Sequence, residues 1–264
     1  MPTVTEDFAG ELSSRWRRHV PGRGSLERGE GTLRLVNCDT SPREYSNAQI
    51  DDYQGLPRRR FHWRPPLKLT VRARFSHAED QLSGTAGFGF WNDPFMMTER
   101  RIPTLPRALW FFHSSPPSDM KLDIDTPGRG WRAATIDALR PAALLMAPLA
   151  LPLVPLMNLR SLYRVLWPPV QRALNVRESL VDVPMTEWHT YRIEWGEERA
   201  AFFADDETVL EDAPAPRGPL GFVMWLDNQY MMVKPWGRFG WGLLREPARQ
   251  WLEVDRLAIE PGTL

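Results

Sequence analysis

Cysteine is almost absent from this sequence of 264 residues, and Cys38 is its only representative. A single cysteine excludes an internal disulfide framework and a zinc site built on several thiolates. A charge excess is also absent, since 33 Lys and Arg are balanced by 33 Asp and Glu. Without a basic surplus there is no overall attraction for nucleic acid. No pair of histidines stands at metal-ligand spacing either, so we predict no metal site, no cofactor and no nucleic-acid partner.

The first residues contain no basic segment followed by an apolar stretch, which is the pattern of a secretory signal. We therefore expect a cytoplasmic protein. An uncharged run over residues 141–157 is slightly short for a membrane-spanning helix. It contains four prolines, whose spacing predicts a helix broken several times, so we expect no transmembrane segment. These prolines are Pro141, Pro148, Pro152 and Pro155.

Tryptophan and proline are both abundant, with 12 and 25 residues. Aromatic side chains suit half-buried strands and proline favours loops, so together they indicate strands joined by many loops. Residues 67–75 and 189–195 alternate apolar and polar side chains, which is typical of strands with one buried face. Residues 200–210 are typical of a hairpin that turns at Asp205 and Asp206. Further strands are predicted at 32–36, 87–91, 108–113, 220–225 and 251–259.

The strand pattern is interrupted between about residues 136 and 183. After the uncharged run, apolar side chains recur at helical spacing, and Pro168 with Pro169 is expected to divide the helix. The recurring positions are Leu156, Leu159, Tyr163, Leu166, Val170 and Leu174. We therefore predict one all-β domain over residues 1–264, an antiparallel sandwich of two sheets. An apolar insertion of two short amphipathic helices at about 136–183 interrupts it.

Residues 187–195, with His189, Tyr191 and Trp195, and the hairpin that follows them resemble the laminarinase-like (family 16) glycoside hydrolases and their non-catalytic relatives. Segments similar to that family occur in the same order at 45–50, 87–91 and 251–257. The resemblance spans nearly everything except the insertion. It implies a concanavalin A-like jelly roll of two antiparallel sheets with a concave face lined by tryptophan.

The catalytic signature of that family is Glu-x-Asp-x-x-Glu on one strand, where alternation places the carboxylates on one face. The closest match lies at 123–128, after a strand-like start at residue 121. The resemblance places Asp123 at the nucleophile position, Asp125 at the middle position and Gly128 at the acid/base position. Because glycine cannot donate a proton, we expect no hydrolysis of the family type.

Any other chemistry is expected to fall on Asp123, Asp125 and His113, which ends a neighbouring predicted strand. A histidine close to two carboxylates can shuttle protons. The alternative is that His113 only satisfies a hydrogen bond at the end of its strand.

Two segments with the same pattern predict a ligand site. Each ends an apolar strand in Trp followed by carboxylate and amide groups, which can stack a ring and hydrogen-bond its rim. The alternative is that the tryptophans fill the core and the polar groups form turns. With Trp110 added, the candidate ligand-binding residues are Trp91, Asn92, Asp93, Trp110, Trp225, Asp227, Asn228 and Tyr230.

The insertion contains no acidic residue between 138 and 176, but it contains Arg140, Arg160, Arg164 and Arg172. Such a segment suits a lid over an apolar pocket, a contact with an anionic bilayer through 140–174, or an extra helical layer. Foremost, we predict a ligand-binding or enzyme-like pocket on the concave face, roofed by the insertion, for a hydrophobic or amphipathic small molecule. The alternatives are a non-catalytic carbohydrate-binding module and a peripheral membrane protein.

Overall fold

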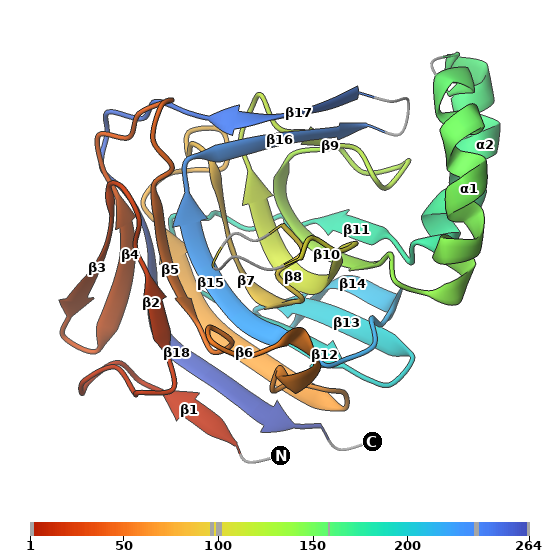
Figure 1. Cartoon of the computed structure of the whole chain (residues 1–264). Coiled ribbons are helices and arrows are strands. Elements are labelled where there is room, and N and C mark those ends of the chain that lie inside the picture. Colours follow the sequence, from red (N-terminus) through yellow and green to blue (C-terminus); the bar gives the residue numbers. More distant parts are fainter. Residues whose placement is uncertain (1–2, 96–97, 99–101, 158, 235–237, 263–264) are drawn as a thin grey trace.

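The computed structural model describes residues 3–95, 98, 102–157, 159–234 and 238–262. Two large antiparallel sheets pack face to face, as the sequence predicts (Figure 1). The first sheet has the order β14-β13-β12-β6-β18-β4-β3, with β1 paired to β18. Its strands are β1 (Val4–Glu6), β3 (Gly24–Gly29), β4 (Thr32–Asn37), β6 (Leu67–Phe75), β12 (His189–Trp195), β13 (Arg199–Ala204), β14 (Glu207–Pro214) and β18 (Gln250–Pro261).

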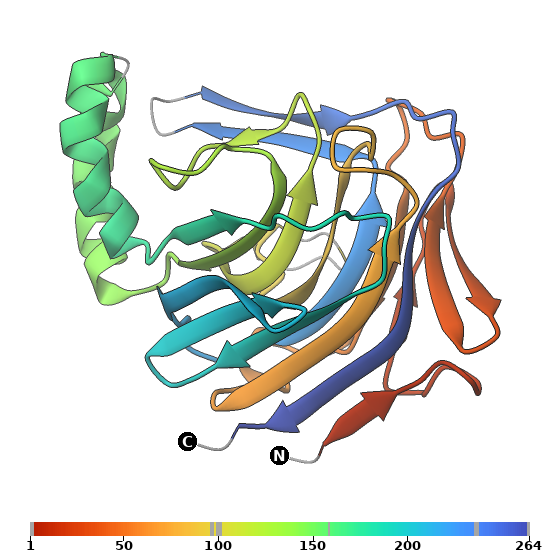
Figure 2. The ribbon, with the colours of Figure 1, turned by 180° about the vertical axis from the view of Figure 1, so that it is seen from behind.

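The second sheet has the order β11-β10-β8-β7-β15-β5-β2. Its strands are β2 (Arg17–His19), β5 (Asn47–Asp51), β7 (Thr85–Trp91), β8 (Arg107–Ser114), β10 (Gly130–Asp137), β11 (Arg177–Leu180) and β15 (Gly221–Asp227). This sheet is curved, and a third, small sheet stands over one end of its concave side (Figures 1 and 2). The small sheet has the order β17-β16-β9, with β9 (Asp119–Met120), β16 (Gln229–Lys234) and β17 (Arg238–Leu243).

Alternating side chains build the core between the two large sheets. Strand β6 buries every second residue from Leu67 to Phe75, and the residues between them are only partly buried. The second sheet contributes its own alternate residues, such as Phe88, Phe111 and Trp131, to the same cluster. Burial of these rings is the main stabilising term of such a sandwich. The predicted all-β sandwich is therefore confirmed, in the sense that one buried core joins both sheets.

The predicted hairpin forms between β13 and β14, and its two turn residues have positive φ angles, 50° at Asp205 and 69° at Asp206. Aspartate tolerates this conformation better than most residues, which explains why the chain turns here. A 3₁₀ turn, η1 (Arg58–Arg60), lies between β5 and β6.

The insertion is helical, as predicted, but its two helices are not the predicted ones: α1 (Pro141–Leu156) covers the uncharged run that was expected to be broken, and α2 (Arg160–Ala173) follows it. The prediction that Pro168 and Pro169 divide the second helix is wrong, because both lie inside α2. Helix α1 likewise continues through its prolines. The prolines inside α1 are Pro148, Pro152 and Pro155, at spacings of four and three residues. The backbone N–H groups that these prolines lack therefore fall along one side of the helix. The opposite side keeps its backbone hydrogen bonds, which explains how the helix persists.

The helices stand beside the β10–β11 edge of the second sheet, and they do not extend over its concave face (Figures 1 and 2). They pack on each other and on the chain after β9, where Tyr163 and Trp167 of α2 contact Leu122 and Ile124. The prediction that the insertion roofs the concave face is therefore wrong. The direction in which the chain leaves β10, at the end of the sheet, places the helices beside the edge of the sheet.

Candidate functional site

Four aromatic rings cover the middle of the concave face. They come from three neighbouring strands, and we call them the aromatic floor: Trp91, Trp110, Phe112 and Trp225. The rings of Trp91 and Trp225 are parallel within 5°, and the ring centroid of Trp110 lies 5.9 Å from the first and 5.5 Å from the second. These tryptophans belong to a cluster separate from the inter-sheet core. Thus the sequence-based alternative that they fill the core does not describe their position.

The small sheet faces this floor from above. Met120 of β9 packs against the floor cluster, and it lies opposite Val233 of β16. Val233 in turn lies opposite Phe239, and Met231 lies opposite Trp241. Because residues opposite each other project from the same face of a sheet, Phe239 and Trp241 point to the side of the small sheet that faces the floor.

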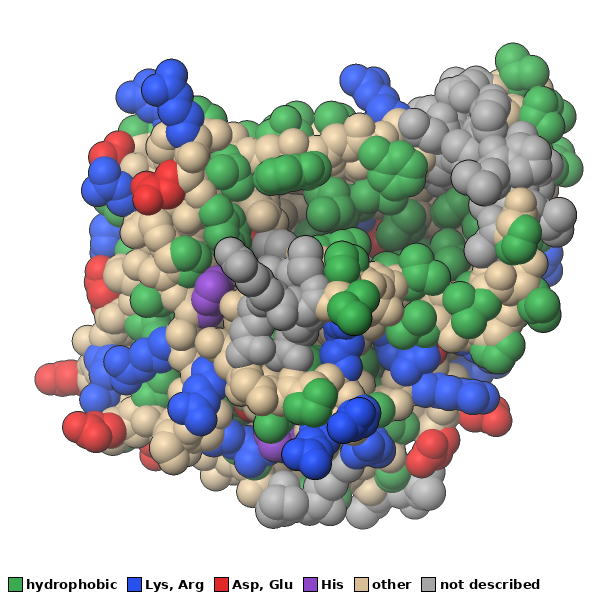
Figure 3. Space-filling model, in the orientation of Figure 1, with side chains coloured by type: hydrophobic (Ala, Val, Ile, Leu, Met, Phe, Trp, Pro, Cys, Tyr) green, Lys and Arg blue, Asp and Glu red, His purple; other side chains and the backbone are tan. Residues whose placement is uncertain are grey.

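We call Phe239 and Trp241 the apolar ledge. They are 74% and 72% exposed, so the floor does not cover them. The molecular surface is hollowed below β16 and β17, and hydrophobic side chains surround the hollow (Figure 3). Trp91, Phe112 and Trp225 of the floor are each 8% exposed and Trp110 is partly buried, so the ledge is the more exposed apolar wall of this hollow. Sequence analysis missed the ledge, although the alternation of aromatic and glycine residues in 238–243 was an available signal.

A hydrogen-bonded network borders the floor on the β5 side. Trp91 Nε1 donates to the hydroxyl of Tyr53 at 2.8 Å, and Gln49 Nε2 donates to Asp51 Oδ2 at 2.9 Å. Thr98 links the Trp91–Tyr53 pair to the Gln49–Asp51 pair, because its hydroxyl lies 2.9 Å from the Tyr53 hydroxyl and 3.1 Å from Gln49 Nε2. Burial raises the pKa of Asp51 despite these donors. The groups of this network are buried and bond one another beside the apolar floor.

The predicted polar ligand residues already bind within the chain. Asn92 accepts a bond from Arg107 N and donates to the Leu105 carbonyl, both at 3.0 Å. Asn228 accepts from Ser46 N at 2.9 Å and donates to three carbonyl oxygens.

Two further predicted residues are buried carboxylates. Asp93 has a positive φ of 46° and is buried. Asp227 accepts bonds from Thr85 Oγ1 at 2.7 Å and Gln229 N at 3.0 Å. Burial raises the pKa of Asp227 to about 6. The last predicted ligand residue, Tyr230 of β16, places its ring over Gly242 of β17.

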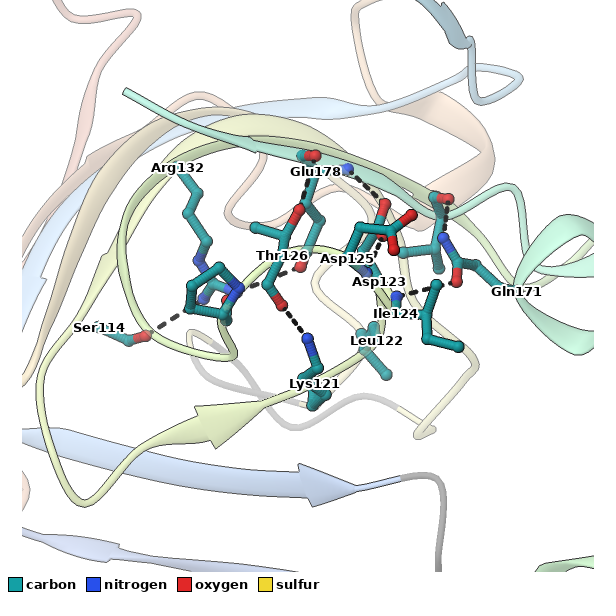
Figure 4. Close-up of polar contacts among 12 residues, drawn as sticks. Ser114, Lys121, Leu122, Asp123, Ile124, Asp125, Thr126, Arg132, Gln171 and Glu178 are labelled. Carbon is teal, nitrogen blue, oxygen red and sulfur yellow. Dashed lines mark hydrogen bonds and ion pairs between the residues drawn. The ribbon is translucent and has the colours of Figure 1, made fainter. Parts of the chain in front are cut away.

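The strand predicted at residues 121–125 is wrong, since β9 ends at Met120 and the following residues form bends. Side-chain bonds hold this segment as a loop against α2 and β11 (Figure 4). Asp123 accepts from Asp125 N at 3.0 Å and from Glu178 N at 3.2 Å, while Gln171 Oε1 accepts from Ile124 N at 3.0 Å. A carboxylate that bonds its own backbone two residues on favours a turn over a strand.

Arg132 and Glu178 form a buried ion pair beneath this loop. Their side chains are 1% and 8% exposed, and Nη1 lies 3.3 Å from Oε2. Arg132 also donates to Ser114 Oγ at 3.2 Å and stacks over Phe112 at 5.4 Å. Burial raises the pKa of Glu178, and the guanidinium opposes this rise. The pair ties β8, β10 and β11 together at the end of the aromatic floor.

The side chain of His113 points into the space between the two large sheets, away from the loop that contains Asp123 and Asp125. It lies opposite Ala86 and Trp131, which belong to the inter-sheet core, whereas its neighbour Phe112 belongs to the floor. Its Nε2 is 3.0 Å from the Glu79 carbonyl oxygen, and burial lowers its pKa to about 4. The structure therefore does not bring the three predicted catalytic residues together.

Gly128 closes the loop, because its carbonyl accepts from Met120 N at 2.7 Å. A Cβ at this position would lie 2.2 Å from Asp119 Oδ1 and 2.9 Å from the backbone nitrogens of Met120 and Lys121. Glycine is thus required by close packing as well as being unable to act as an acid.

We expect Gly128→Ala to lower the free energy of unfolding by about 1–3 kcal/mol, because backbone atoms must move to admit the methyl group. Urea denaturation measures this change. Gly10→Ala is the matched control, since a Cβ there meets nothing within 4 Å. Equal stability of the two variants would contradict the packing described for the loop.

Among the described residues no three or more His, Cys, Asp and Glu side chains are grouped so that they could hold a metal ion. In the same part of the chain, no helix is both long and apolar enough to cross a membrane.

No protein-family model and no curated protein matches the chain. Several solved structures do match the chain. A prokaryotic β-1,3-1,4-glucanase (lichenase) from a mouse hindgut metagenome is 14% identical, with a TM-score of 0.53 over 99% of this chain and 100% of that one. The κ-carrageenase from Pseudoalteromonas carrageenovora is 9% identical, with a TM-score of 0.54 over 97% and 92%.

An endo-β-galactosidase from Clostridium perfringens is 13% identical, with a TM-score of 0.53 over 97% of this chain and 61% of that one. At such identities the likeness establishes the fold alone. The chain has the concanavalin A-like jelly-roll fold found in family 16 glycoside hydrolases, as its sequence motifs indicate.

Proposed function

We propose that the protein binds an amphipathic small molecule with a flat, apolar body in the cleft between the aromatic floor and the apolar ledge. The exposure of Phe239 and Trp241, on the face of the small sheet that is turned toward the floor, supports this most directly. Exposed aromatic pairs in a concave site lose water when a flat molecule enters between them. The buried Gln49–Asp51 network, whose groups already bond one another, holds Trp91 of the floor in place through the Tyr53 hydroxyl.

Binding without family-type hydrolysis is favoured by the strands under the floor. Neither β7 nor β8 contains Asp or Glu, although these are the central strands of the sheet. Both carboxylate oxygens of Asp123 already accept hydrogen bonds from backbone N–H groups, one in the loop and one in β11. A retaining hydrolase needs two carboxyl groups about 5 Å apart on either side of the scissile bond.

Carbohydrate binding is the second candidate, and the fold favours it. The solved structures with this fold include the lichenase and a κ-carrageenase in complex with an oligotetrasaccharide of κ-carrageenan. Sugar rings also stack on tryptophan, so the aromatic floor suits either ligand. The apolar ledge distinguishes the two proposals, because a second exposed aromatic wall favours a ligand that is apolar on both faces.

Titration with the fluorescent dye 8-anilinonaphthalene-1-sulfonate, which has a flat apolar body and one anionic group, tests the first proposal. We expect Trp110→Ala and Trp241→Ala each to weaken dye binding about 30-fold, as for a buried tryptophan anchor. Trp188→Ala is the matched control, because Trp188 stacks under Arg72 and Arg74 of the first sheet.

Dye binding that is the same in the wild type and in all three variants would refute the cleft as the site. Titration of β-glucan oligosaccharides against the same variants tests the second candidate. Loss of oligosaccharide binding in Trp110→Ala without an effect of Trp241→Ala would favour a carbohydrate module.

A further inference from the structure

The helical insertion leaves large apolar side chains exposed on both of its helices and between them. On α1, Leu144 and Leu145 are exposed, the latter at 78%, and on α2 Val165 is 70% exposed. Leu156 and Leu159 are also exposed where the two helices connect. The opposite side of α2, with Tyr163 and Trp167, is buried on the loop after β9. An isolated leucine on a surface needs no explanation, but such a cluster on one projecting element indicates a contact surface.

Positively charged arginine side chains lie near these exposed apolar side chains. Helical spacing places Arg164 and Arg172 in the same exposed sector of α2 as Leu162 and Val165. Among the residues that the structure describes, neither arginine forms an ion pair. From residue 138 to residue 176 the sequence contains four arginines and no acidic residue. An apolar helical face with arginines beside it complements a surface that is apolar inside and anionic outside.

From this combination we propose that α1 and α2 dock on an anionic lipid bilayer. The exposed leucines and Val165 enter the boundary between headgroups and acyl chains, and Arg164 and Arg172 contact the lipid phosphates. The helices lie on the bilayer and do not span it, in agreement with their length and prolines. The inference does not depend on the cleft, because no floor or ledge residue belongs to the docking surface.

Co-sedimentation of the full chain with vesicles tests the inference. We expect binding to vesicles of equal parts phosphatidylcholine and phosphatidylglycerol, and much weaker binding to phosphatidylcholine alone. Arg164→Gln with Arg172→Gln should lower partitioning to the anionic vesicles about fivefold for each charge removed. Leu145→Glu with Val165→Glu should abolish it. Val20→Glu, at an exposed valine beside β2, is the control and should bind like the wild type.

Three results would overturn the inference. These are no wild-type binding to anionic vesicles, equal binding to both vesicle types, and sedimentation that ignores both pairs of substitutions. A second copy of the chain is the other occupant to consider. A dimer in light scattering that Val165→Glu converts to a monomer, with no vesicle binding, would assign the surface to self-association instead. Dye titration of the same variants separates this question from the cleft, since binding there should not change.

Discussion

Replacing Arg132 with methionine is expected to lower the free energy of unfolding by about 3–5 kcal/mol, because it leaves the Glu178 carboxylate buried without its cation. Both side chains are almost fully buried, and the guanidinium also bonds Ser114 and the Pro127 carbonyl. Urea denaturation at neutral pH measures the loss. The loss should shrink as the pH falls, since a protonated Glu178 no longer carries an unpaired charge.

The double variant Arg132→Met with Glu178→Leu is the matched control. It removes both charges at once, and exchanging a buried ion pair for apolar groups of similar volume is often neutral. We therefore expect it to recover most of the stability lost in Arg132→Met. A single variant as stable as the wild type would show that the pair is not buried as described.

Stability is also expected to fall as the pH rises from about 4 to about 7, because of Asp52. Burial raises the pKa of this carboxyl from 3.8 to about 7, even though Trp63 Nε1 and Phe222 N donate to it at 2.5 and 2.9 Å. Between these values the folded chain holds a proton that the unfolded chain has lost. Raising the pH through this window therefore favours unfolding, by up to roughly 4 kcal/mol at 1.36 kcal/mol per pKa unit.

Asp52→Asn removes this titration. The stability of the wild type relative to Asp52→Asn should therefore decline between pH 4 and pH 7 and stay level above it, as measured by urea denaturation across the range. Asp206→Asn, at a side chain that is 94% exposed, should follow the wild type at every pH. A constant difference between the wild type and Asp52→Asn would contradict the raised pKa.

Those strands that were predicted correctly have a local cause. Alternation in residues 67–75 and 189–195 follows from one buried face, and Asp205 with Asp206 follows from the dihedral angles of a tight turn. The family resemblance predicted the same jelly roll. In these segments the tertiary contacts agree with the preference of residues close together in the chain, so the local pattern was sufficient to predict them.

The wrong predictions concern features that are set by contacts between residues far apart in the chain. The segment 121–125 alternates like a strand, but backbone N–H groups of Asp125 and Glu178 bond Asp123 and fold it into a loop. The same holds for the site. Trp91, Trp110 and Trp225 remain predicted ligand residues, and the concave face that they share depends on which strands pair with β7. His113 was separated from the carboxylates by the alternation of a strand whose register the sequence does not specify.

By itself, the sequence determined the alternating strands such as 67–75 and 189–195, the turn at Asp205 and Asp206, and the helical character of the insertion, since each is a property of residue type and local period. Only the tertiary structure decided that α1 and α2 stand beside the sheet, and that Phe239 and Trp241 face the aromatic floor. The reason is that strand pairing sets which faces meet. Met120, Val233 and Phe239 share one face only because β9, β16 and β17 pair in that register, which no single segment specifies.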